Sequence, residues 1–169
     1  MSPMDVREVT VGADISAPPE RVWQVVIDIT VMPRFSTELI GVQWADGFNA
    51  PGLGAQFLGR NRHSAIGEWT TRSQITAFDR PRTFGWSVGD LEMPAATWRF
   101  DLAPRPGGTR LTYTAQIGPG PSGVTMLIER SPHRAERIVE NRLAQFREAM
   151  AATLTGIGQL AEKGSGQSR

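Results

Sequence analysis

The chain has 169 residues, a net charge of +1 from 18 basic and 17 acidic residues, and no cysteine. This length is typical of a single domain that can bury a full hydrophobic core. Without cysteine the chain has no disulfide, thiolate metal ligand or cysteine nucleophile, and its balanced charge argues against a surface for nucleic acid.

The two ends of the sequence differ from its centre. The opening segment MSPMDVREVTVG has no apolar stretch like that of a signal peptide, and no apolar run approaches 18 residues. We therefore expect no membrane span and a cytoplasmic location. We also expect one domain over residues 1–163 and a flexible tail over 164–169, because GSGQSR is small and polar.

The first predicted elements are a strand and two short helices. Apolar residues alternate with polar residues and glycine over 9–15, which predicts a half-buried strand. The segment ISAPPERVWQVVIDI (15–29) predicts an amphipathic helix, because its two prolines suit a first turn and valines follow at helical spacing. We expect Pro33 to end this helix and VMPRFSTE (31–38) to form a second short helix.

Six more segments alternate between apolar and polar residues. They cover residues 40–44, 55–63, 69–77, 84–88, 96–102 and 111–117. Most of the links between them have the length of hairpin turns, which predicts a single antiparallel sheet of about seven strands.

The C-terminal part of the sequence predicts helices. GVTMLIERSPHRAER (123–137) predicts a first segment that breaks near Pro132. From Ala135 onward one apolar stripe continues over more than two dozen residues, formed by Val139, Leu143, Phe146, Met150, Leu154, Ile157 and Ala161. Such a helix is about 35–40 Å long at about 1.5 Å per residue, so it can lie across the whole sheet.

The strand faces predicted to point inward mix large aromatic with small or hydroxyl-bearing residues. The aromatic members are Phe57, Trp69, Trp86, Trp98 and Tyr113, and the others are Gly59, Asn61, Thr71, Ser73 and Ala115. This mixture is typical of a cavity for a small molecule, and a filled core with satisfied hydroxyls is the alternative.

The sequence has two basic features of interest, the segment GRNRH and Arg142. In GRNRH (59–63), alternation assigns Arg60 and Arg62 to the outer face, and Asn61 and His63 to the inner face, with His63 near the rim. Arg142 lies at the edge of the apolar stripe. Its guanidinium either turns inward toward an anionic or carbonyl-bearing ligand or extends outward beside the sheet.

The chain resembles the START/Bet v 1-like (SRPBCC) superfamily, in its polyketide cyclase/dehydrase-like branch. The segments that carry the resemblance are APPERVWQVVID, VMPRFSTELIGVQW, GLGAQFLGRNR, EWTTRSQI, WRFDLAPRPGGTRLTYT and the long final helix. The resemblance implies an α+β helix-grip fold, in which a curved antiparallel sheet of about seven strands wraps around a long C-terminal helix and encloses a hydrophobic cavity.

The resemblance also bears on catalysis. Aromatases of this family place a tryptophan, a hydroxyl-bearing residue and an arginine at alternating inward positions of the central strand. The matching positions here are Trp69, Thr71 and Ser73, so the arginine is missing, and Arg72 should point outward. The catalytic residues of a cyclase stay unassigned, and the remaining acid–base candidates are Tyr113, His63 and Glu68.

A glycine-rich segment, GPGPSG (118–123), has the spacing of a dinucleotide-binding loop. Pro119 and Pro121 have no N–H group to offer a phosphate, and no βαβ unit surrounds the segment. We expect instead a stiff loop that enters the last helices beside the mouth of a cavity.

Other site chemistries lack the residues that they need. His63 and His133 are far apart in the sequence and belong to no ligand motif, which argues against a metal site. No serine lies in a G-x-S-x-G motif or beside a recognisable base, so Ser36, Ser73 and Ser131 are not expected nucleophiles. We expect neither metal nor cofactor.

These observations favour the binding of a small hydrophobic molecule, lipid-like or polyketide-like, between the sheet and the last helix. The predicted ligand-binding residues are Phe57, Asn61, Trp69, Thr71, Ser73, Trp86, Trp98, Tyr113, Arg142, Phe146 and Met150. The first alternative is an aromatic polyketide cyclase or dehydratase that acts on a carrier-bound poly-keto chain, and the second is a protein-interaction module. Monomer and homodimer stay undecided.

Overall fold

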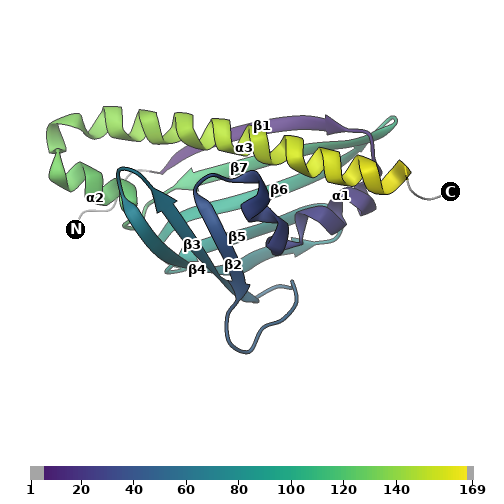
Figure 1. The fold of residues 1–169 in the computed structure, drawn as a ribbon, viewed down its shortest axis with the longest axis horizontal. Helices are drawn as coiled ribbons and strands as arrows, with labels where there is room; N and C mark the ends of the chain where they lie inside the picture. The colour runs from purple at the N-terminus through teal and green to yellow at the C-terminus, as the bar shows by residue number, and fades with distance from the viewer. Residues whose placement is uncertain (1–5, 167–169) are drawn as a thin grey trace.

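The computed structural model describes residues 6–166, in which seven strands and five helical segments form one α+β unit (Figure 1). The strands are β1 (Arg7–Ile15), β2 (Leu39–Trp44), β3 (Gln56–His63), β4 (Gly67–Asp79), β5 (Thr83–Gly89), β6 (Pro94–Arg105) and β7 (Gly108–Ile117). The helices are α1 (Pro19–Val26), the 3-10 helix η1 (Ile29–Phe35), α2 (Gly123–Arg130), the 3-10 turn η2 (Pro132–Arg134) and α3 (Ala135–Gly166).

All seven strands belong to one antiparallel sheet with the order β1-β7-β6-β5-β4-β3-β2. Strands β2 to β7 follow one another as a meander, and β1 closes the order beside β7. Tight turns at Gly67 and Gly107 adopt positive φ angles of 94° and 81°, which glycine accepts without strain. The predicted seven-stranded sheet is confirmed, although β4 and β6 are longer than the alternation indicates.

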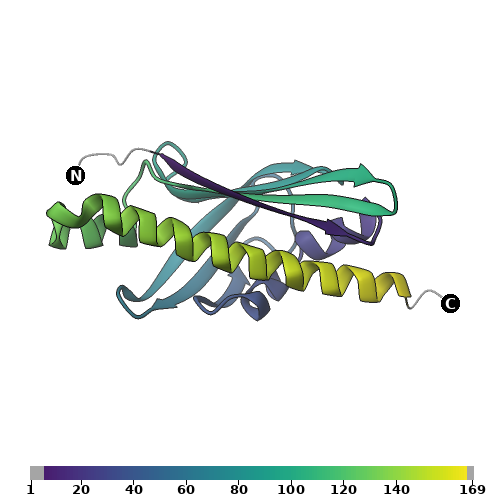
Figure 2. The ribbon, with the colours of Figure 1, turned by 90° about the horizontal axis from the view of Figure 1, so that it is seen from above.

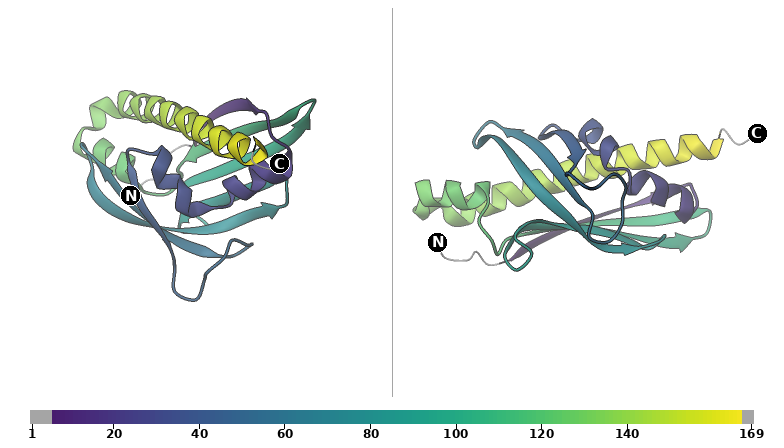
Figure 3. Two further views of the ribbon diagram at one scale, coloured as in Figure 1. Left: turned by 45° about the vertical axis from the view of Figure 1, so that its right-hand side comes forward. Right: turned by 90° about the horizontal axis from the view of Figure 1, so that it is seen from below.

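The sheet curves beneath α3, and the β3–β4 hairpin rises toward α2 at one end (Figure 3). Helix α3 has 32 residues, or about 48 Å at about 1.5 Å per residue, and runs along the whole sheet (Figure 2). Its buried side includes Met150, Leu154 and Ile157 of the predicted apolar stripe. This arrangement confirms the helix-grip fold.

Helix α3 continues to Gly166. Residues Gly164–Gly166, expected to begin a flexible tail, are the last turn of α3, and residues 167–169 lie outside the described part of the chain. Small and polar side chains lower helix propensity, but a helix already held by tertiary packing continues through them.

Helix α1 and the 3-10 helix η1 are the two short helices predicted after the first strand, with different boundaries. Helix α1 ends at Val26, earlier than predicted, because the Asp28 carboxylate accepts a hydrogen bond from Thr30 N (3.1 Å) and starts η1. Pro33 lies inside η1 rather than ending a helix.

Helix α1 fills one end of the space between the sheet and α3. Trp23 packs edge-on against Phe78 and Phe84, with ring centroids 5.3 and 6.3 Å apart. Val22, Trp23 and Val26 are almost completely buried, and α1 contacts α3 directly. The core at this end is solid, so any cavity must lie under the other half of α3.

Candidate functional site

A cavity of about 220 Å³ lies between the sheet and the N-terminal half of α3. Its walls come from η1, from strands β2 to β7, from α2, and from Arg142 to Thr153 on α3. The volume is below the roughly 300–1,000 Å³ of pockets that hold drug-sized molecules. The cavity therefore suits a compact molecule better than a long chain.

Aromatic rings form a continuous wall on the sheet side of this cavity. Trp86 stacks on Trp98 at an interplanar angle of 17°, and the Trp98 ring lies 4.9 Å from the ring of Phe146 on α3. Tyr113 lies beside Trp98, with ring centroids 5.6 Å apart. Aromatic pairs contribute about 0.5–1.5 kcal/mol each beyond the burial of their surface, so these contacts stabilise the wall.

The hydroxyl-bearing side chains of Ser73 and Tyr113 belong to the cavity wall. Ser73 and Tyr113 are only 3% and 5% exposed, yet neither side-chain hydroxyl forms a hydrogen bond with any residue from 6 to 166. Burial raises the pKa of the Tyr113 phenol, so the group stays protonated at neutral pH and can donate a hydrogen bond. Both side chains line the cavity, so a ligand oxygen or nitrogen beside either hydroxyl would find a free hydrogen-bonding group.

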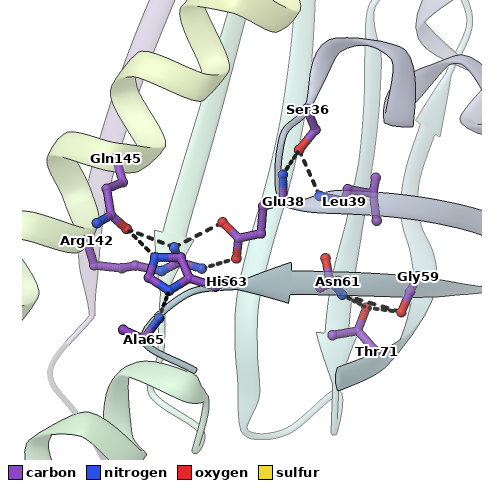
Figure 4. A network of polar contacts seen from close by, with 10 residues as sticks. All are labelled: Ser36, Glu38, Leu39, Gly59, Asn61, His63, Ala65, Thr71, Arg142 and Gln145. Atoms are coloured by element: carbon purple, nitrogen blue, oxygen red, sulfur yellow. Dashed lines mark hydrogen bonds and ion pairs between the residues drawn. The ribbon is translucent and has the colours of Figure 1, made fainter. Parts of the chain in front are cut away.

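A second polar group lies between β3 and β4 (Figure 4). Asn61 Nδ2 is 3.4 Å from both Gly59 O and Thr71 Oγ1, so these hydrogen bonds are long. A Cβ atom at Gly59 would lie 2.9 Å from Thr71 Oγ1, so only glycine leaves room for this pair. Asn61 and Thr71 line the cavity with donors and acceptors that are only loosely engaged.

Arg142 turns inward and forms an ion pair rather than an open anion site (Figure 4). Its Nη1 donates to Glu38 Oε2 (3.0 Å) and its Nη2 donates to Glu38 Oε1, which makes the pair bidentate. The guanidinium also covers the Phe146 ring, 4.7 Å from its centroid. Of the two orientations of Arg142 that the sequence left open, the inward one is observed. The charge of the guanidinium, however, is already neutralised by Glu38.

His63 lies at the rim of the cavity and not on its wall. Its Nδ1 accepts a hydrogen bond from Ala65 N (3.0 Å), so the neutral ring carries its proton on Nε2 and donates to Gln145 Oε1 (3.2 Å). Gln145 Oε1 also accepts from Arg142 Nη1 (3.0 Å), which joins the hairpin to α3 (Figure 4). His63 thus connects elements, and this position does not support the predicted acid–base role.

Glu68 also lies away from the cavity. Its carboxylate is exposed and pairs with Arg62 across β3 and β4, at 3.2 Å. Alternation correctly placed Arg60 and Arg62 on the outer face, where both are exposed. Of the three acid–base candidates, only Tyr113 reaches the cavity.

The GPGPSG loop connects β7 to α2, and its last two residues line the cavity, as expected for a loop beside the mouth. Ser122 N donates to Thr125 Oγ1 (3.0 Å), which starts α2. A Cβ atom at Gly123 would lie 2.7 Å from Ile66 Cδ1, so the β3–β4 hairpin closes against this glycine.

Every residue predicted to bind a ligand lies on the cavity wall. Ala115 points inward as predicted, but it is packed in the core and does not line the cavity. The sequence did not indicate Glu38 or the η1 residues Ile29 and Met32, which also line the cavity. The apolar character of Ile29 and Met32 was a usable signal, whereas nothing local distinguishes Glu38 from a surface carboxylate.

The residues from 6 to 166 also bear on metal binding and on membrane association. No group of three or more histidine, aspartate or glutamate side chains between residues 6 and 166 is arranged to hold a metal ion. Within the same range, no helix combines the length and apolar character needed to cross a membrane.

Solved structures show what the fold is similar to. The solution structure of the Polyketide_cyc-like protein Cgl2372 from Corynebacterium glutamicum matches with a TM-score of 0.65 and 28% identity, over 92% of this chain and 91% of that one. The ZhuI aromatase/cyclase from Streptomyces sp. R1128 matches with a TM-score of 0.64 and 17% identity, over 94% of both chains. The di-domain ARO/CYC protein StfQ from the steffimycin biosynthetic pathway matches with a TM-score of 0.71 and 13% identity, over 95% of this chain and 52% of StfQ.

At such identities the two aromatase/cyclases support the fold alone. No curated protein matches the sequence. The model of one family, described as polyketide cyclase / dehydrase and lipid transport, matches residues 6–154, which include the whole sheet and more than half of α3. The chain therefore belongs to the polyketide cyclase/dehydrase and lipid transport family.

Proposed function

We propose that the protein binds a small hydrophobic ligand, lipid-like or polyketide-like, in the cavity between the sheet and α3. One observation carries the proposal: the aromatic wall of the cavity includes the hydroxyl-bearing residues Ser73 and Tyr113, whose side chains form no hydrogen bond with residues 6–166. Apolar walls with a few oriented polar groups are typical of ligand sites. The family description, which includes lipid transport, agrees with this role.

The cavity volume restricts the ligand. At about 220 Å³ the cavity accepts a compact molecule of one or two rings, and a longer chain would extend beyond it. The stacked Trp86 and Trp98 rings favour a flat, unsaturated ligand, because offset stacking adds to the burial of apolar surface.

Binding can be tested with 2-acetylnaphthalene, which combines two rings with one carbonyl, and with naphthalene. Calorimetry and quenching of tryptophan fluorescence should both report saturable binding of the ketone. Ala96→Phe fills the cavity from β6 without removing a polar group and should abolish binding. Thr97→Phe, the next residue, lies on the opposite face of the sheet and is the matched control. If a broad panel of neutral aromatic and lipid-like molecules fails to bind, the proposed function is wrong.

A cyclase or dehydratase activity is the second candidate, and Tyr113 is the observation that favours it. Its protonated phenol lines the cavity and could polarise a ligand carbonyl. The only charged residues on the described cavity wall, Glu38 and Arg142, are bonded to each other, which leaves no free general base. Tyr113→Phe should then abolish cyclised product from a carrier-bound poly-keto chain, and unchanged product excludes this role for Tyr113.

A further inference from the structure

The charges of the cavity wall are confined to one pair. Among the described residues that line the cavity, Glu38 and Arg142 alone are charged at neutral pH. Their side chains are 26% and 9% exposed, and two hydrogen bonds join them. The cavity is therefore electrically neutral as a whole.

A buried arginine without this partner would attract anions. A guanidinium presents a planar set of donors that matches a carboxylate, and such charge-assisted bonds are the stronger class of hydrogen bond. Here three of those donors are already engaged, two by Glu38 and one by Gln145. A ligand carboxylate would meet both an occupied arginine and the negative charge of Glu38.

The remaining polar groups suit an uncharged acceptor. The hydroxyls of Ser73 and Tyr113 are neutral donors. They belong to the same wall as the ion pair, since Arg142 covers Phe146, Phe146 contacts Trp98, and Trp98 contacts Tyr113. A ligand that spans this wall would meet the ion pair at one end and the phenol at the other.

We propose that Glu38 determines the charge of the ligand: by neutralising Arg142, it makes the cavity select neutral carbonyl- or hydroxyl-bearing molecules over carboxylates. This inference rests on the proposed function, because it concerns the ligand of the same cavity. It assigns Glu38 a role in specificity through Arg142, and it identifies the preferred ligand as an uncharged aromatic ketone or alcohol.

The test compares 2-acetylnaphthalene with 2-naphthoate, which have nearly the same shape and differ in charge at neutral pH. The wild-type protein should bind the ketone at least about tenfold more tightly than the acid. Glu38→Gln keeps the size of the side chain and frees the arginine charge, so the affinity for the acid should rise about tenfold relative to the affinity for the ketone.

Two variants control for charge and for position. The double variant Glu38→Gln/Arg142→Gln has neither charge and should again prefer the ketone. Glu68→Gln removes a carboxylate of the same size from an exposed ion pair outside the cavity, so it should leave both affinities unchanged.

The outcomes distinguish a failure of the proposed function from a failure of the inference about Glu38. Binding of neither molecule, nor of any other neutral probe, overturns the proposed function and this inference with it. Equal wild-type binding of ketone and acid overturns the inference alone. If Glu38→Gln weakens the binding of both molecules equally, the role of Glu38 is structural, and the inference is also overturned. If Glu38→Gln does not fold, Glu38→Asp keeps the negative charge and must keep the preference for the ketone; a gain in acid binding contradicts the inference.

Discussion

Arg142 Nη1 lies 3.0 Å from Glu38 Oε2, and this ion pair ties α3 to the residue that precedes β2. Arg142 is nearly buried, so its charge depends on Glu38 for compensation. The same guanidinium reaches Gln145, whose Oε1 also accepts from His63 at the β3–β4 hairpin. One pair therefore anchors two separate parts of the sheet to the helix above the cavity.

The contributions of the two members of this pair to stability should be coupled. We expect Glu38→Gln to lower the free energy of unfolding by about 1–3 kcal/mol, because it leaves a nearly buried guanidinium without its anion. Arg142→Gln/Glu38→Gln should cost less than the sum of the single changes. Urea unfolding of the four proteins measures the coupling, and additive effects contradict it.

The unpartnered hydroxyls should contribute to binding rather than to folding. We expect Ser73→Ala and Tyr113→Phe each to change the free energy of unfolding by less than about 0.5 kcal/mol, since no hydrogen bond is lost. Each should weaken binding of 2-acetylnaphthalene by about two- to tenfold if its hydroxyl donates to the carbonyl.

Thr109 gives the matched control for these two changes. Its side chain is fully buried, and its Oγ1 donates to Ala17 O at 2.7 Å. Thr109→Val should therefore cost about 1–3 kcal/mol of stability without altering ligand affinity, because it removes a satisfied hydroxyl away from the cavity. Equal stability losses for Ser73→Ala and Thr109→Val would show that Ser73 has a structural role.

Tyr113 permits a direct titration, since it is the only tyrosine in the chain. Burial raises the pKa of its phenol above the ordinary value of about 10. The folded-state pKa exceeds the unfolded one, so this contribution to stability is complete below about pH 10 and is lost as the pH rises toward the folded-state pKa.

The ultraviolet absorbance of phenolate should therefore not appear at the ordinary tyrosine pKa while the protein is folded. It should appear together with the loss of structure, and circular dichroism at alkaline pH measures that loss. Tyr113→Phe should remove the signal and leave the rest of the alkaline transition, which arises from other groups. A phenolate signal near pH 10 in the folded protein, about the ordinary tyrosine value, contradicts the burial of this group.

Alternation along the strands was sufficient to predict most of the strand residues that line the cavity. Residues such as Phe57, Thr71 and Trp98 lie at alternate positions of strands whose other face is polar, and side chains in a strand point to opposite faces in turn. The apolar stripe of α3 likewise predicted which of its sides faces the sheet. These local periodicities determine which way each side chain points, and the folded protein keeps that orientation.

Partners that are distant in the sequence could not be predicted in this way. Glu38 and Arg142 are 104 positions apart, and their contact depends on the curvature of the sheet and the position of η1. The position of His63 near the rim was expected, but its hydrogen bond to Gln145, 82 positions away, could not be predicted. The helical boundary at Val26 depends on a side-chain cap, Asp28, which the pattern of valines does not reveal.

The position of η1, which supplies Ile29 and Met32 to the cavity, depends on one glycine of α3. Gly156 is buried, and a Cβ atom there would collide with the ring of Phe35 at the end of η1. We expect Gly156→Ala to lower the free energy of unfolding by about 1–3 kcal/mol, because the ring or the whole η1 segment must move.

Gly158, on the same helix, isolates this steric effect from helix propensity. A Cβ atom at Gly158 would lie 3.6 Å from Ile15 Cγ1, an ordinary contact. Gly158→Ala should therefore stabilise the protein by up to about 1 kcal/mol, since alanine favours a helix interior over glycine. Thermal and urea unfolding of the two variants should differ in sign. If both substitutions stabilise the protein, Phe35 moves aside without cost, and the close packing of η1 on α3 does not determine the shape of the cavity.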